Sequence, residues 1–231
     1  MRILYLIPAR KGSKGLPHKN TKILGEKPLI EYSIDFALQN MNFEDELCIS
    51  TDDSNVIKIA ESKGIKIPFI RPKALSNDNA TSYDVIKHAL NYYTNNNNKF
   101  DVILLLQPTS PFRDKQDLIR LINQFDSDTD MVASVSLAKE NPYFTLFEED
   151  SNGFLYKSKK GNFERRQDCP KVYKLNGSMY LIKIGSIKKY KIDDFKNVKK
   201  IIMPNERSVD IDTTEDWILA EYFLKSKINK L

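Results

Sequence analysis

The chain has 231 residues, of which 41% are hydrophobic, and its 36 lysines and arginines against 31 aspartates and glutamates give a net charge of +5. This composition fits one globular domain of generous size, and no stretch approaches the roughly 20 apolar residues that span a bilayer. The first apolar run is too short and lacks the small residues of a cleavage site, so we expect no signal peptide. The two cysteines, Cys48 and Cys169, lie far apart and suit a reducing compartment, so we expect a cytoplasmic protein without a disulfide framework.

Three short apolar runs in the first half predict strands at 3–8, 46–52 and 102–108. Each is too short for a helix and apolar at consecutive positions, as in strands that are buried on both faces. Segments with helical periodicity lie between and after them; they open near Pro28, near Asp53, after Thr81 and before Leu118. In the first of these helices, the predicted buried stripe is Ile30, Ile34, Ala37 and Leu38. This alternation predicts an α/β fold, a Rossmann-like, mostly parallel sheet with helices on both faces.

The pattern loosens after a further apolar segment at 130–138. Residues 139–175 combine scattered prolines, glycines, aromatics and charges without a helical stripe, which predicts an inserted excursion, a hairpin or a small lobe, within a single domain of 1–231. Residues 178–184 and 199–204 predict a return to strands, and 213–231 predict a closing helix.

Polar residues follow each predicted strand on its carboxyl side. They occupy four segments: 9–20, 50–55, 107–113 and 210–212. In an open parallel sheet, ligands bind outside the carboxyl ends of the strands, so we expect these remote segments to converge on one rim.

The first of these segments predicts an anion site. It combines glycines, a hydroxyl and cations: Gly12, Gly15, Ser13, Arg10, Lys14 and Lys19. Glycines let backbone N–H groups approach an anion closely, and clustered cations repel one another unless a polyanion binds, which suits a nucleoside triphosphate. The alternative is a flexible basic turn with solvated lysines, and the pattern alone does not decide between the two. The loop is neither a Walker A nor a GxGxxG sequence, which disfavours P-loop and dinucleotide-binding proteins.

The segment "DID" predicts a metal site. Side chains two apart on an extended chain share a face, so Asp210 and Asp212 point the same way and together suit one Mg²⁺. The alternative for Asp212 is a helix N-cap with Glu215 as its capping-box partner, although this leaves the charge of Asp210 unexplained. The segment 107–113, "QPTSPFR", predicts a rigid turn that opens a helix at 114, with Gln107 placed to hydrogen-bond a sugar.

In this order, the motifs resemble those of the bacterial acylneuraminate cytidylyltransferases, the CMP-sialic acid synthetases. The similarity runs from about residue 3 to 225. It is carried by "IPARKGSKGLPHKN", "ISTDD", "IRPKALSND", "LLQPTSPFR", "RRQDCPKVYKLNGSMYLI" and "DIDTTED". The resemblance implies a nucleotide-diphospho-sugar transferase fold, and a homodimer in which each excursion reaches the partner's active site.

The resemblance also implies a role for individual residues. One set would bind the phosphates and ribose of CTP: Arg10, Ser13, Lys14, Lys19 and Asn20. Two residues would lie around the cytidine: Arg71 and Asp78. Others would contact the sugar acid, the last two from the excursion of either subunit: Gln107, Asn176, Tyr180, Arg166 and Lys174. The metal, Mg²⁺ or Mn²⁺, would be held by Asp210 and Asp212, which with Arg10 form the expected catalytic set.

The implied reaction joins CTP to a nine-carbon 2-keto sugar acid of the N-acetylneuraminate type. The anomeric hydroxyl would attack the α-phosphorus in line and release pyrophosphate, with Asp210 or an Asp-bound water as the base. Lys174 stands where many relatives have arginine, and a lysine cannot grip a carboxylate at two points. Legionaminate and pseudaminate therefore stay open as alternative substrates.

Two other classes of protein share some of these features. A non-catalytic basic module that binds nucleotides or RNA would explain the charge, but the glycine loop has no aromatic platform for bases. A nicotinamide oxidoreductase would need GxGxxG and an acid about twenty residues later. We therefore expect CTP and a sugar acid as partners, and neither nucleic acid nor a membrane.

Overall fold

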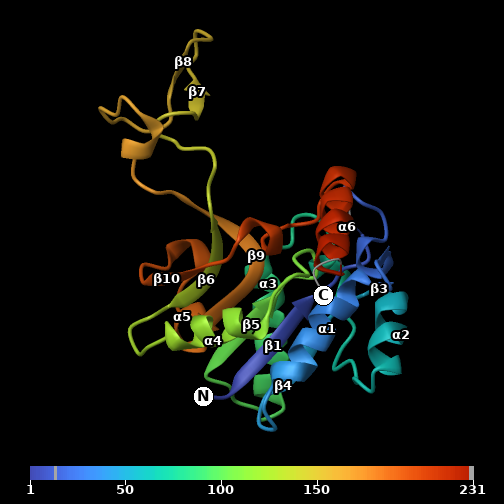
Figure 1. The fold of residues 1–231 in the computed structure, drawn as a ribbon. Helices are drawn as coiled ribbons and strands as arrows, with labels where there is room; N and C mark the ends of the chain where they lie inside the picture. The colour runs from blue at the N-terminus through green and yellow to red at the C-terminus, as the bar shows by residue number, and fades with distance from the viewer. Residues whose placement is uncertain (13–14, 229–231) are drawn as a thin grey trace.

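The protein is built around a six-stranded sheet in a computed structural model that describes residues 1–12 and 15–228 (Figure 1). The strand order is β10-β6-β9-β5-β1-β4. Their bounds are β1 (Ile3–Pro8), β4 (Glu46–Ser50), β5 (Val102–Leu106), β6 (Met131–Leu137), β9 (Tyr173–Lys183) and β10 (Val198–Ile202). Adjacent strands are parallel except at β9, which runs antiparallel to both β5 and β6. The predicted mostly parallel α/β sheet is confirmed.

All but one of the helices in the described residues lie where the apolar periodicity predicts them; the exception, at 184–187, begins at the end of a predicted strand. They are α1 (Leu29–Asn40), α2 (Ser54–Ser62), α3 (Ser82–Asn95), α4 (Lys115–Asn123), the short α5 (Ile184–Ile187) and α6 (Thr214–Ile228). One residue of the predicted buried stripe in α1 is wrong: Leu38 is 43% exposed. Phe36, which was not predicted, is buried in the same helix. No helix of the described residues is long and apolar enough to cross a membrane.

Alternate residues of β1 face two separate cores. Tyr5 and Ile7 pack with side chains of α1, α2 and α4, whereas Leu4 and Leu6 pack with α3 and α5. Because side chains alternate along a strand, a strand that is apolar at every position needs cover on both faces. Helices on both faces supply this cover.

A third apolar cluster fixes the loops at the carboxyl edge. It brings side chains of α6 against the first loop and the polar segments: Leu16, Leu24, Leu29, Phe112, Val209, Ile211, Trp217 and Ala220. The backbone N–H of Ile211 also donates to the carbonyl of Thr109, at 2.8 Å. Two of the predicted polar segments are thereby held side by side.

Between β6 and β9 the chain leaves the body of the protein, and Figure 1 shows this part standing clear of the sheet. It contains an antiparallel hairpin of β7 (Phe147–Glu149) and β8 (Leu155–Lys157). The strand predicted from residue 178 begins instead at Tyr173, because polar residues before Gly177 mask its apolar pattern in the sequence. The end of the predicted excursion therefore belongs to the sheet.

Candidate active site

The carboxyl ends of β1 and β5 border a cavity of about 520 Å³. Its lining comes from three of the four predicted polar segments and from the chain around α3: Pro8, Arg10, Gly15, Lys19, Asn20, Asp78, Ser82, Gln107, Pro108, Thr109, Asp212 and Thr213. The segment 50–55 does not line it. There, Asp52 accepts a hydrogen bond from the backbone of Lys11, and Asp53 caps α2.

The first loop reaches the far side of this cavity. Lys19 and Asn20 lie in the 3-10 helix η1 (Lys19–Thr21) and are buried, and the Lys19 Nζ lies 2.7 Å from Asp212 Oδ1. Arg10 Nη2 lies 2.6 Å from Asp78 Oδ1. A Cβ at Gly15 would lie 2.2 Å from the carbonyl oxygen of Asp212, so only glycine allows this approach. Ser13 and Lys14 lie outside the described residues.

The two aspartates of "DID" differ in environment. They lie in an extended segment rather than a strand. Val209 and Ile211 are buried and Asp212 is exposed, whereas Asp210 is only partly exposed, so a shared face for the two carboxylates stays a prediction. Burial raises the pKa of Asp210, and the nearby charge of Asp212 raises it further, while a hydrogen bond from Thr109 opposes the shift. Asp210 Oδ1 is buried and has no hydrogen-bond partner among the described residues.

The N-cap interpretation of Asp212 is wrong. The helix begins at Thr214, so Thr213 is the residue before it, and its Oγ1 accepts from the backbone of Asp216 at 3.2 Å. Asp216 in turn accepts from the backbone of Thr213 at 2.9 Å, which completes a capping box without Glu215. The carboxylate of Asp212 is therefore not used by the helix.

The aspartate pair fits a hard divalent cation. Carboxylate oxygens are its preferred ligands, and a buried oxygen without a partner, as in Asp210, is costly unless something binds it. Among the described residues, no group of three or more histidine, cysteine or acidic side chains gathers to hold a metal alone. An ion held here would take its remaining ligands from water or phosphate, as Mg²⁺ commonly does.

A second cavity, of about 540 Å³, adjoins the first and shares Ser82 and Gln107 with it. Its remaining lining is Thr81, Tyr83, Asp84, Leu105, Met131, Leu175, Tyr180, Ile182, Lys191, Ile192 and Asp193. The hydroxyl of Tyr180 accepts from the backbone N–H of Gly177 at 3.0 Å, and burial raises the pKa of this tyrosine.

Gly177 packs closely against residues of the candidate site, although no motif of the sequence assigns it a role there. Its φ is +71°, and a Cβ there would lie 2.9 Å from Gln107 Oε1, 3.0 Å from Ser110 Oγ and 3.4 Å from Asp210 Oδ2. The Asn-Gly pair at 176–177 is a sequence signal for positive φ that would have identified it.

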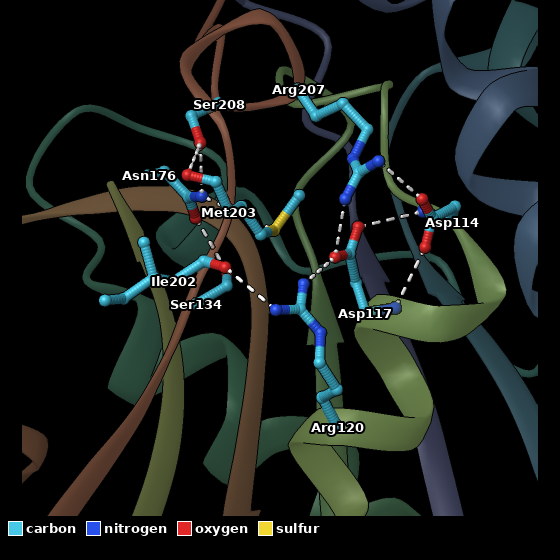
Figure 2. A network of polar contacts seen from close by, with 9 residues as sticks. All are labelled: Asp114, Asp117, Arg120, Ser134, Asn176, Ile202, Met203, Arg207 and Ser208. Atoms are coloured by element: carbon cyan, nitrogen blue, oxygen red, sulfur yellow. Dashed lines mark hydrogen bonds and ion pairs between the residues drawn. The ribbon is translucent and has the colours of Figure 1, made fainter. Parts of the chain in front are cut away.

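Asp210 lines neither cavity, and the same is true of four other predicted residues. Asn176 is buried; its Oδ1 accepts from Ser134 Oγ at 2.6 Å and its Nδ2 donates to Ser208 Oγ at 2.9 Å (Figure 2). Arg71 is buried at the end of β4, where burial lowers its pKa to about 10.

The other two are more exposed. Arg166 lies on the excursion and donates to the carbonyl of Lys139. Lys174 lies on β9, close enough to Asp210 for its charge to lower the pKa of that carboxyl. The structure thus gathers Arg10, Lys19, Asn20, Asp78, Gln107 and Asp212 around one cavity and Tyr180 in the next.

A mostly parallel sheet with a basic loop and a carboxylate pair at its carboxyl edge defines a nucleotidyltransferase-like α/β protein. Among solved structures, the fold is similar to that of CMP:2-keto-3-deoxy-manno-octonic acid synthetase complexed with CTP, with a TM-score of 0.70 at 16% identity over 98% of this chain and 100% of that chain.

Sequence comparison gives the family. The cytidylyltransferase family model matches residues 4–227, and this chain belongs to that family. It is 35% identical to a CMP-N,N'-diacetyllegionaminic acid synthase of Legionella pneumophila over 97% of both chains, and 32% identical to a pseudaminic acid cytidylyltransferase of Campylobacter jejuni, also over 97% of both. It is 34% identical to an N-acylneuraminate cytidylyltransferase of Escherichia coli over 95% of this chain, which spans 51% of that protein. The resemblance drawn from the motifs is confirmed.

Proposed function

We propose that this protein transfers CMP from CTP to the anomeric hydroxyl of a nine-carbon 2-keto sugar acid and releases pyrophosphate. The observation that carries the proposal is the pairing of two adjoining cavities, one bordered by Arg10, Lys19 and Asp212 and the other by Tyr180, with Gln107 in both. A nucleotide in the first and a sugar in the second would meet at Gln107.

The cations of the first loop would bind the triphosphate. Arg10 and Lys19 line the cavity, and the predicted ligands Ser13 and Lys14 belong to the same loop. Pyrophosphate is the leaving group, so cations that neutralise its developing charge lower the barrier more than they aid ground-state binding. Arg71 and Asp78 remain proposed to lie around the cytidine.

Asp210 and Asp212 would hold Mg²⁺ or Mn²⁺. When bound, such an ion supplies charge neutralisation for the phosphates. The raised pKa of Asp210 makes its carboxylate a stronger base, which suits it to accept the proton of the anomeric hydroxyl directly or through a water.

The second cavity would take the sugar acid. Apolar side chains, among them Leu105 and Ile182, suit an acyl substituent, and Gln107 and Tyr180 suit hydroxyl groups. Lys174 and Arg166 would pair with the carboxylate. Since Arg166 stands on the excursion and lines neither cavity of its own subunit, it supports a homodimer in which this residue serves the partner's site. Asn176 would act on the sugar only through its neighbours, because its side chain is buried.

The test is pyrophosphate release from CTP with N-acetylneuraminate, legionaminate, pseudaminate and the eight-carbon acid Kdo, with and without Mg²⁺. We expect kcat/KM to be at least about 100-fold higher for a nine-carbon acid than for Kdo, because polar pockets discriminate strongly when buried groups lose their partners. Legionaminate and pseudaminate are the second candidates, since relatives named for them are as similar to this chain as those named for neuraminate. Equal use of Kdo, or no release with any of the four, would overturn the proposal.

A further inference from the structure

The guanidinium of Arg207 bridges two carboxylates at the start of α4 (Figure 2). Arg207 lies in the 3-10 helix η5 (Asn205–Arg207); its Nη1 lies 2.7 Å from Asp114 Oδ2 and its Nη2 2.9 Å from Asp117 Oδ1. Asp114 is the N-cap of α4, and Asp117 completes its capping box. The capping box therefore holds both carboxylates in place independently of Arg207.

One carboxylate of the bridge is removed from water, whereas Arg207, Asp114 and Arg120 stay partly exposed. Asp117 is fully buried, and its Oδ1 also accepts from Arg120, whose Nη1 donates to the carbonyl of Ile202 at 3.2 Å. Two cations thus balance two carboxylates. Burying the charge of Asp117 costs several kcal/mol, and pairing it with arginines adds little net stability, so this contact serves better to specify position.

The chain that follows Arg207 carries Asp210, three residues further on. Ser208, next to Arg207, accepts from Asn176 Nδ2 at 2.9 Å, as Figure 2 shows. Val209 is buried in the third apolar cluster, and Ile211 donates its backbone N–H to Thr109. Asp210 is therefore held between points that are each anchored.

The same helix start is tied to the other side of the site. Arg113, directly before Asp114, is buried, and its Nη2 donates to the carbonyl of Gln107 at 2.7 Å. Arg207 thus links the chain that leaves β10, which carries Asp210, to the chain that leaves β5, which carries Gln107.

We propose that Arg207 is a positioning residue that fixes Asp210 relative to Gln107 by bridging Asp114 and Asp117, and so sets the affinity of the aspartate pair for its divalent cation. This inference rests on the proposed function of Asp210 and Asp212.

The test compares Arg207→Ala and Arg207→Lys with the wild type and with Lys199→Ala. The control removes a partly exposed ion pair to Asp126 from strand β10, near the end of the strand that lies farther along the chain from Arg207. Mn²⁺ binding in the presence of CTP is measured by electron paramagnetic resonance, and kcat and KM by pyrophosphate release.

For Arg207→Ala we expect Mn²⁺ affinity and kcat to fall about 10- to 100-fold, the range for residues that orient metal ligands, with the KM for CTP within about 3-fold. Raising the Mg²⁺ concentration should recover part of kcat, which a general loss of structure would not allow. Arg207→Lys should be intermediate, because a lysine cannot reproduce the fork. Lys199→Ala should match the wild type in both measurements.

A folded Arg207→Ala protein with wild-type Mn²⁺ affinity and kcat would overturn the inference. Should that variant fail to fold, Asp114→Asn removes one arm of the bridge, and unchanged Mn²⁺ affinity in this variant would overturn the inference equally. Failure of the wild type to release pyrophosphate would refute the proposed reaction, yet the Mn²⁺ titrations of the same variants would still decide the role of Arg207. A wild-type protein that binds no Mn²⁺ would refute the proposed role of Arg207.

Discussion

Lys19 and Asp212, which lie at opposite ends of the sequence, form an ion pair with an Nζ–Oδ1 distance of 2.7 Å. The lysine side chain is buried and the aspartate side chain is 67% exposed. The pair joins the proposed phosphate loop to the proposed metal segment. A bound phosphate would pair with Lys19 and a bound divalent cation would pair with Asp212. When both ligands bind, each of the two side chains therefore exchanges one charged partner for another.

Asp212→Asn should separate the metal role from a structural one. We expect kcat to fall by about 100-fold or more, in the range seen when a group that stabilises transition-state charge is removed, and the free energy of unfolding to change by less than about 1 kcal/mol, as for a partly exposed ion pair. Thr213→Ala, which removes the true helix cap, should instead cost about 1 kcal/mol of stability. Urea denaturation and pyrophosphate release measure the two effects. A destabilisation by Asp212→Asn larger than that by Thr213→Ala would contradict this separation.

Asp210→Asn should stabilise the metal-free protein at neutral pH while abolishing most activity. Burial raises the pKa of Asp210 in the folded state, so its contribution to stability is present below the unfolded pKa of about 3.9 and is lost as the pH rises through the folded pKa. Asparagine does not ionise, so the variant does not lose this stability as the pH rises. In EDTA, the melting temperature of the variant should exceed that of the wild type at pH 7, by about 2–4 °C for each kcal/mol relieved, and approach it near pH 4. A variant less stable than the wild type at pH 7 would show that the charge of Asp210 is already compensated by the protein.

Arg10→Ala should impair the use of CTP far more than it disturbs folding. The ion pair of Arg10 with Asp78 is partly exposed on both sides, so its loss should cost at most about 1 kcal/mol of stability. The kcat/KM for CTP should fall about 10-fold or more, mainly through kcat, since hydrogen bonds between charged groups contribute about 1.5–3 kcal/mol. Wild-type binding of CTP should also weaken as salt is added. A loss of several kcal/mol in stability with unchanged kinetics would make Arg10 a structural residue.

Local patterns in the sequence predict most of the helices and strands, because apolar periodicity and helix capping depend on residues that are close in the chain. The strands at 3–8 and 102–108 are apolar at consecutive positions, and α3 and α4 begin at capping boxes with clear apolar periodicity. The position of β9 is not predictable in this way. Its insertion between β5 and β6, antiparallel to both, depends on pairing between distant segments.

The sequence predicts which segments meet at the candidate site, but it does not predict which side chains contact one another there. The convergence of the first loop, 107–113 and 210–212 follows from parallel strands that end at one edge. The contacts of individual side chains do not follow from this rule. The amide side chain of Asn176 suits a sugar ligand, but it hydrogen-bonds to Ser134 and Ser208 instead. Arg207 belongs to no recognised motif, and its partner Asp117 is 90 residues away in the sequence.

Gly177→Ala, compared with Gly64→Ala, should separate backbone strain from loss of the site. Both glycines have positive φ, +71° and +75°, so alanine at either should cost about 1–2 kcal/mol of stability. At Gly64 the added methyl meets no atom within 4 Å, whereas at Gly177 it lies 2.9 Å from Gln107 Oε1 and 3.0 Å from Ser110 Oγ.

These contacts require Gln107 to move from the junction of the two cavities. We therefore expect Gly177→Ala to lower kcat/KM for the sugar acid by about 100-fold, the effect of a misplacement of about 1 Å, and to unfold at lower urea than Gly64→Ala. Gly64→Ala should keep wild-type kinetics, because α2 ends there away from both cavities. Urea denaturation and pyrophosphate release on both variants are the measurements. Equal stability and wild-type kinetics in the two variants would mean that Gln107 adjusts freely, and the junction would then not be the point at which nucleotide and sugar are aligned.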